Sequence, residues 1–214
     1  MAGSRKKYVI GIDFDNTIIN YDSVIYNIAY EMGLVDAGVK KDKKEIRDNI
    51  RKLENGDVEW QKIQALIYGD RIKEAEMFSG VKDFFRLCVE NNLRKYVVSH
   101  KTQYSNLYKD GVDFRDSALN WMRENNFFCG EFEISEKDVF FESTREEKLR
   151  RIKDLGCTHF IDDLVEVFLD EEFPEGVHKI LFDKNNSYKN ENLENMIILN
   201  GWNKITDYIF NDRK

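Results

Sequence analysis

Residues 8–17 read YVIGIDFDNT, and this stretch sets the expected architecture. Its first five residues are aromatic, aliphatic or glycine and do not alternate with polar ones, which is typical of a strand buried on both faces of a parallel sheet. The run stops at Asp13, and Asp15 and Thr17 follow at alternate positions. Because extended residues point to alternate sides, we expect Asp13 and Asp15 to project toward a common site.

Short apolar runs recur further along the chain and predict four more strands, at 96–98, 139–141, 159–161 and 179–182. Apolar residues at helical spacing lie between them. One stripe runs from Val81 to Val89, and another, over Leu149, Ile152 and Leu155, ends at Gly156, which suits a left-handed cap. Strands that alternate with helices predict an α/β fold with a Rossmann-like parallel sheet.

Residues 22 to about 77 break this alternation and predict three consecutive helices without a strand. Val24–Met32 carries the first, Ile46–Leu53 a second that ends at Gly56, and Asp57 is the expected cap of a third that stops at Gly69. We therefore expect a small inserted α-helical cap over residues 21–78, packed over a core of residues 1–20 and 79–214.

Composition excludes several classes of protein. The chain has 214 residues and a net charge of −7, which disfavours nucleic acid as a partner. No apolar stretch approaches the roughly 18 residues that span a bilayer, and Asp13 interrupts the N-terminal apolar run, so we expect a cytoplasmic protein without a membrane partner. Three distant cysteines argue against disulfides and a thiolate zinc site, and Cys88 and Cys157 are expected to be buried thiols. The mixed-charge stretch Lys40–Lys44 is expected to be a solvated helix start.

Polar side chains follow three of the predicted strands. Asp13 ends the first, Ser99 and His100 follow the run at 96–98, and Asp162 and Asp163 follow the run at 159–161. The sequence TREE at 144–147 is a capping box, which places Lys148 in the first turn of a helix. Ligands of open α/β sheets bind beyond the carboxyl ends of the strands, so we expect a site there for one phosphate group and one Mg²⁺ ion.

These motifs, in this order and context, resemble the haloacid dehalogenase (HAD) superfamily over most of the chain. The segment 21–78 lies where the helical cap of one branch of that superfamily is inserted. The competing interpretation of Asp13, Asp15 and Thr17 as a calcium loop fails, because its sixth position is Ile18 and its twelfth is Val24.

The resemblance implies catalytic roles for two aspartates. Asp13 is the expected nucleophile, and Asp15 is the expected acid for the leaving oxygen and base for water. Metal ligands are expected from Asp13, the Asp15 carbonyl and Asp163, with Asp162 as a supporter, and this oxygen-only set suits Mg²⁺. Glu166 is a weaker candidate.

The same resemblance implies a phosphate site made of Thr17, Ser99, Lys148 and the backbone N–H groups of Phe14 and His100. Three other cations compete with Lys148 for this role: Lys101, Arg145 and Lys153. Lys153 is expected to point away, because it lies five residues further along the helix. Asn16 stands where the superfamily usually has glycine, and asparagine tolerates the same turn geometry.

The acid at position 15 decides between reactions, because dehalogenases of this superfamily lack it. We therefore expect a Mg²⁺-dependent phosphatase that acts through an aspartyl-phosphate on a small phosphorylated metabolite, with sugar phosphates favoured and nucleotides left open. Two alternatives remain at this point: a phosphomutase on a sugar phosphate, and a non-catalytic binding module of the same fold. The oligomeric state is not predicted.

Overall fold

The computed structural model describes residues 8–105, 107, 111–189, 191 and 193–211. Its residues group into two compact units. The first unit consists of Met1–Ile18, Phe78–His100 and Asn126–Lys214, and the second consists of Ile19–Met77 and Lys101–Asn125.

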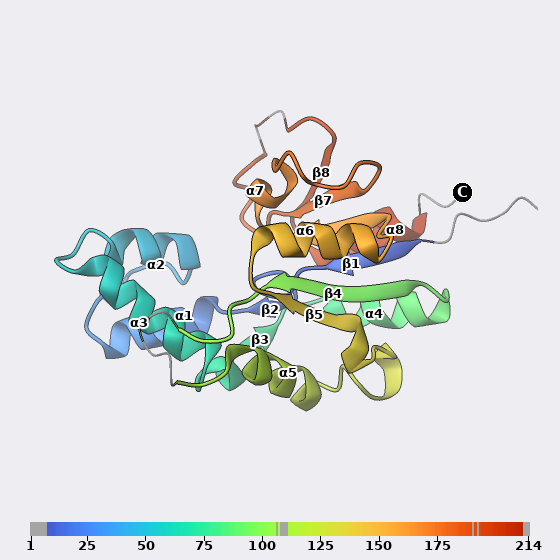
Figure 1. Cartoon of the computed structure of the whole chain (residues 1–214). Coiled ribbons are helices and arrows are strands. Elements are labelled where there is room, and N and C mark those ends of the chain that lie inside the picture. The colour runs from blue at the N-terminus through green and yellow to red at the C-terminus, as the bar shows by residue number, and fades with distance from the viewer. Residues whose placement is uncertain (1–7, 106, 108–110, 190, 192, 212–214) are drawn as a thin grey trace, which may run out of the picture. The chain divides into compact units, whose positions relative to one another are not determined.

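A parallel sheet forms the centre of the first unit (Figure 1). Within the described residues it has six strands, in the order β5-β4-β1-β6-β7-β8. The strands are β1 (Val9–Ile12), β4 (Arg94–His100), β5 (Val139–Glu142), β6 (His159–Asp162), β7 (His178–Phe182) and β8 (Met196–Leu199). All five predicted strands are present, and the α/β class with a parallel sheet is confirmed. β8 is an additional strand, paired with β7 at the edge.

Helices cover both faces of this sheet. They are α4 (Val81–Glu90), α6 (Arg145–Asp154), α7 (Val165–Phe168) and α8 (Trp202–Asn211), with 3₁₀ turns η2 (Gly130–Phe132) and η3 (Glu136–Asp138). Leu181 of β7 belongs to the core beneath α6 and α7. Its neighbour Phe182 contacts Trp202 of α8, which in turn contacts Phe84 of α4. Because neighbouring strand residues point to opposite faces, α6 and α7 lie on one face and α4 and α8 on the other.

The second unit is mainly helical. It contains α1 (Asp22–Glu31), α2 (Lys43–Ile50), α3 (Gly56–Tyr68), the 3₁₀ turn η1 (Ile72–Glu74), α5 (Phe114–Glu124) and an antiparallel pair of two-residue strands, β2 (Ile19–Asn20) and β3 (Glu76–Met77). The three predicted helices are present. The prediction that residues 22 to 77 contain no strand is wrong at the end of this range, where β3 lies.

Gly56 begins a helix instead of ending one. α2 stops at Ile50, and Gly56 is the first residue of α3, whose N-cap is Asn55 in the left-handed conformation. A Cβ atom at Gly56 would lie 2.1 Å from the carbonyl oxygen of Ile50. Glycine is needed here for that close approach, and the predicted cap residue, Asp57, lies one position inside the helix.

The second unit also differs from the expected segment 21–78, because residues 101–125 join it. Trp121 of α5 donates its indole N–H to the carbonyl oxygen of Ala75 at 2.9 Å, and Phe114 contacts the ring of Tyr68 edge-on. These contacts connect parts of the chain that are far apart in sequence, so helical spacing alone does not reveal them.

Several smaller expectations are confirmed. Cys88 and Cys157 are buried free thiols, and Cys129 is exposed. The stretch Lys40–Lys44 contains the start of α2, with exposed lysines around the N-cap Asp42, whose carboxylate accepts from the N–H of Glu45. None of the helices described is both long and apolar enough to cross a bilayer.

Candidate active site

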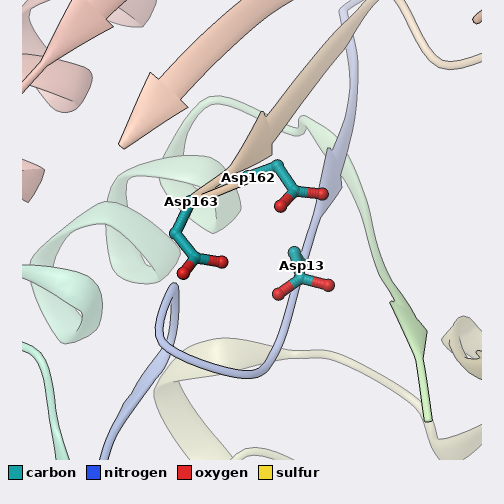
Figure 2. A group of neighbouring side chains, drawn as sticks. All are labelled: Asp13, Asp162 and Asp163. Atoms are coloured by element: carbon teal, nitrogen blue, oxygen red, sulfur yellow. The ribbon is translucent and has the colours of Figure 1, made fainter. Parts of the chain in front are cut away.

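Three aspartates gather at the carboxyl ends of β1 and β6, all within the first unit. Asp13 directly follows β1, and its backbone N–H donates to the carbonyl oxygen of Ile161 at 2.8 Å. Asp162 is the last residue of β6 and Asp163 follows it. One carboxylate oxygen from each of Asp13, Asp162 and Asp163 lies within 4.8 Å of the other two. Figure 2 shows the three side chains. The pairing of β1 with β6 therefore brings together residues that are about 150 positions apart.

Lys148 enters this cluster from α6. Thr144 caps the helix by accepting from the N–H of Glu147, and the Glu147 carboxylate accepts from the N–H of Thr144, which is the predicted capping box. The Lys148 ammonium, on the fourth residue of the helix, donates to Asp13 Oδ1 at 2.7 Å and to Asp162 Oδ2 at 2.6 Å. Only 2% of its side chain is exposed. The capping box thus fixes where α6 begins, and thereby the position of Lys148 on the helix.

Burial by itself disfavours a charged ammonium, yet the pKa of Lys148 lies above its ordinary value. Desolvation lowers the pKa, but the negative charges of Asp13 and Asp162 and their hydrogen bonds raise it by more. Lys148 therefore remains protonated throughout the physiological range and supplies a fixed positive charge beside the Asp13 carboxylate.

Asp13 accepts hydrogen bonds from three different elements. Ser99, near the end of β4, donates its hydroxyl to Oδ1 at 2.8 Å, on the same oxygen that Lys148 contacts. The Thr17 hydroxyl lies 3.4 Å from Oδ2, a longer contact. Ser99 and Thr17 are almost fully buried, at 1% and 0% exposure. These donors hold the Asp13 carboxylate in one orientation, as a reacting group requires.

Asp162 and Asp163 lie in different environments. Asp162 is completely buried, and both of its oxygens are engaged, Oδ2 with Lys148 and Oδ1 with the N–H of Leu164 at 3.0 Å. Burial raises the pKa of Asp162 to about 6. Lys148 and the Leu164 N–H oppose this shift, and the charge of Asp13 adds to it. Asp163 is half-buried and thus the more accessible of the pair.

The turn after Asp13 is fixed by packing and hydrogen bonds. Phe14 is fully buried against the edge of Phe141, and the Trp202 indole N–H donates to the Thr17 carbonyl at 2.9 Å. Asn16 has a φ of 59°, so it occupies the left-handed region where the superfamily usually has glycine. Asp15 lies in this turn and is half-buried.

The remaining candidates are placed less centrally. The His100 side chain is exposed, and its Nε2 lies 3.0 Å from the carbonyl oxygen of Ser143. Only its backbone N–H remains a candidate for phosphate, as predicted. Lys153 and Glu166 are exposed. Lys101 belongs to the second unit, where its ammonium lies 4.3 Å from the centre of the Tyr68 ring. Arg145 lies 4.0 Å from Asp170.

The sequence analysis missed Asp183, which follows β7 at the same edge of the sheet. It is buried, and its carboxylate accepts from the N–H groups of Ser187 and Tyr188 at 2.8 and 2.9 Å. Burial, and then the charges of nearby acids, Glu166 first, raise the pKa of Tyr188 in this loop. The sequence could have indicated Asp183, because this aspartate directly follows the strand predicted at 179–182.

The acidic cluster has the chemistry of a site for a hard cation. Three carboxylates face one buried ammonium, so negative charge is in excess, and a divalent cation bound here would balance it. In the same loop, the side-chain oxygen of Asn16 is buried without a hydrogen-bond partner among the described residues. Oxygen donors, an unbalanced charge and an unsatisfied acceptor are consistent with the expected Mg²⁺.

Comparison with known proteins agrees with this geometry at the level of the fold. No protein-family model and no curated protein matches the sequence. Many solved structures do match. A haloacid dehalogenase-like hydrolase of Streptococcus pneumoniae superposes with a TM-score of 0.62 at 15% identity, over 95% of this chain and 98% of that one. The chain has the HAD fold.

Proteins with this HAD fold differ in what their structures contain. A protein described as a dehalogenase gives a TM-score of 0.56 at 9% identity, over 94% of this chain and 96% of that one. The CbbY protein of Rhodobacter sphaeroides, solved with xylulose-1,5-bisphosphate, gives 0.51 at 13% identity, over 92% and 95%. At these identities the similarity establishes the fold, and the reaction must be argued from the residues.

Proposed function

We propose that this protein is a Mg²⁺-dependent phosphatase that hydrolyses a small phosphomonoester through an aspartyl-phosphate on Asp13. The observation that carries the proposal is the environment of the Asp13 carboxylate. It is held by Lys148 and Ser99 and lies within 4.8 Å of the carboxylates of Asp162 and Asp163. A carboxylate attacks a phosphate dianion only when their charge repulsion is screened.

In the proposed reaction, an oxygen of Asp13 attacks phosphorus and the alcohol oxygen of the substrate leaves. Lys148 holds positive charge beside the reacting carboxylate. When substrate binds, the hydroxyls of Ser99 and Thr17 turn from Asp13 to phosphate oxygens, which also accept from the backbone N–H groups of Phe14 and His100. Mg²⁺, held by Asp13, Asp163 and the Asp15 carbonyl with Asp162 in support, supplies electrostatic screening when bound.

Asp15 favours phosphatase over dehalogenase chemistry. An alkoxide leaving group needs a proton, whereas a halide does not, so a carboxylic acid two residues after the nucleophile is useful only for the first reaction. Asp15 then accepts a proton from the water that hydrolyses the aspartyl-phosphate. The half-buried position of Asp15 in the turn after Asp13 supports this role.

Sugar phosphates are the favoured substrates within this proposal. The sugar bisphosphate bound to the structurally similar CbbY protein supports this class. The net charge of −7 argues against a nucleic acid, and we propose a small cytoplasmic metabolite as the partner. A sugar phosphomutase is the second candidate, because it requires the same residues and differs only in keeping water from the aspartyl-phosphate.

The direct test is phosphate release from p-nitrophenyl phosphate and from a panel of sugar phosphates, with and without Mg²⁺. We expect turnover that needs the metal, and at least a roughly 10³-fold loss in Asp13→Asn. Asp154→Asn, an exposed aspartate at the end of α6, is the matched control and should retain activity. A folded protein without turnover on any substrate of the panel would favour the binding-module alternative.

A second variant tests the acid. Asp15→Asn should lose more activity on a sugar phosphate than on p-nitrophenyl phosphate, because p-nitrophenolate leaves without being protonated. Equal losses on both substrates would argue against Asp15 as the proton donor. Activation by a sugar bisphosphate without release of phosphate would identify the phosphomutase instead.

A further inference from the structure

A polar cavity lies in the first unit, at the amino end of β4. It has a volume of about 290 Å³. The end of α4, the first residues of β4 and the acids Glu133 and Asp138 line it. The polar and ionisable residues that matter here are Cys88, Asn92, Arg94, Lys95, Glu133 and Asp138. Lys95 is four residues before Ser99 in β4, so the two Cα atoms are about 13 Å apart at the usual rise of a strand.

Lys95 is the unusual residue of this cavity. It is 8% exposed, and its ammonium makes one hydrogen bond, 3.4 Å long, to the carbonyl oxygen of Glu133. In the part of the chain that the structure describes, no ion pair involves Lys95. An ammonium has three donors, and a buried charge is costly unless it is paired. Among the described residues its other two donors have no acceptor, and Lys95 lines the cavity, so we take the cavity as the place where a ligand would meet them.

The electrostatic environment of Lys95 and the backbone conformation of Glu133 also indicate a ligand site in this cavity. Burial lowers the pKa of Lys95, and electrostatic interactions with Cys88, Glu133 and Asp138 oppose this shift without cancelling it. Glu133 adopts a φ of 42°, a left-handed conformation that is uncommon for a residue other than glycine, asparagine or aspartate. Such backbone outliers cluster at ligand sites.

The charges around the cavity restrict its ligand. A simple anion would meet the carboxylates of Glu133 and Asp138, and a simple cation would meet Arg94 and Lys95. We propose that the cavity binds a small zwitterion of amino-acid size, with its carboxylate on Lys95 and Arg94 and its ammonium on Glu133 and Asp138. The volume is close to the lower end of small-molecule sites. This site is distinct from the Asp13 cluster and does not depend on the proposed phosphatase activity.

The test is calorimetric titration of the full chain with the twenty free amino acids, with acetate and methylamine as probes of a single charge. We expect at least one amino acid to bind at one molecule per chain, and acetate and methylamine to bind at least tenfold more weakly. The absence of binding by every amino acid at 10 mM, roughly the weakest affinity of interest, would overturn the proposal. Equal binding of acetate would overturn it too.

Variants assign the binding to this cavity. Lys95→Met keeps an unbranched side chain that is one atom shorter and removes the charge, and it should weaken binding at least tenfold. Lys153→Met, an exposed lysine on α6, is the control and should bind as the parent does. Glu133→Gln leaves Lys95 in place, so it keeps the test valid if Lys95→Met fails to fold. Parental affinity in Glu133→Gln, or in folded Lys95→Met, would place the ligand elsewhere and overturn the proposal.

Discussion

Lys148 is the residue on which the arrangement of buried carboxylates depends. It donates to Asp13 and Asp162 at once and is itself almost completely buried. A buried ion pair contributes little to stability, but removing one partner leaves the other charge buried and uncompensated. Lys148 is therefore expected to matter for folding as well as for catalysis.

Replacing this lysine should make stability strongly dependent on pH. We expect Lys148→Met to lose about 3–5 kcal/mol of unfolding free energy at pH 7.5 in the presence of a chelator, because Asp13 and Asp162 then lack a cation. Folding already raises the pKa of Asp162 from 3.8 to about 6, so its favourable contribution is present at low pH and is lost as the pH rises through about 6. Without Lys148 the pKa rises further.

The deficit of Lys148→Met relative to the parent should accordingly shrink as the pH falls from 7.5 to 5. Denaturant titrations at both pH values measure it, with Lys153→Met as the matched control on the same helix. A deficit that is the same at both pH values would show that the carboxylates are not the cause.

Thiol reactivity gives an independent measure of residue burial. Cys129 is exposed, whereas Cys88 and Cys157 are buried and burial raises the pKa of Cys157 to about 12. Since the thiolate is the reactive form, we expect one fast thiol per native chain with Ellman's reagent and three after denaturation. Cys129→Ser should remove the fast phase. Two fast thiols in the native protein would contradict the packing around α4 or β6.

At the scale of elements, β1 packs closely against β6 and its neighbours because residue 11 is a glycine without a side chain. A Cβ atom at Gly11 would lie 2.5 Å from the ring of Phe160 and 3.0 Å from the sulfur of Cys157. We expect Gly11→Ala to destabilise the fold by about 1–3 kcal/mol through overpacking. Thermal unfolding measures this, and Phe160→Leu in the same chain should recover part of the loss. Gly38→Ala, where nothing lies within 4 Å, is the control.

The sequence predicts those elements whose signals are local. The strands around β1 are recognisable because both faces are buried, and α6 because its capping box is explicit. The four apolar residues of β8 are too few to separate a strand from a buried helical turn. α5 has an N-cap at Asp113, but its membership of the second unit depends on long-range contacts such as Trp121 to Ala75. Local patterns cannot encode such contacts.

At the scale of the whole molecule, the candidate site is a consequence of sheet topology. Asp13, Ser99 and Asp162 are predictable as strand ends, and parallel pairing of β4, β1 and β6 puts them at one edge. The order of the strands is the information that a single sequence lacks. This is why the resemblance of ordered motifs, and not any one motif, predicted both the fold and the cluster.

The excess of negative charge in that cluster should also link metal binding to global stability. The proposed Mg²⁺ site at Asp13 and Asp163 exists only in the folded chain, so a bound ion should stabilise the protein by about 2.7 kcal/mol at a hundred times its Kd. We expect the Tm to rise with Mg²⁺ in the parent and in Asp154→Asn, and to change little in Asp163→Asn. Because Asp163→Asn removes part of the mutual repulsion of the cluster, its Tm without metal should equal or exceed that of the parent. A metal-dependent rise of the same size in Asp163→Asn would show that Mg²⁺ stabilises the chain elsewhere.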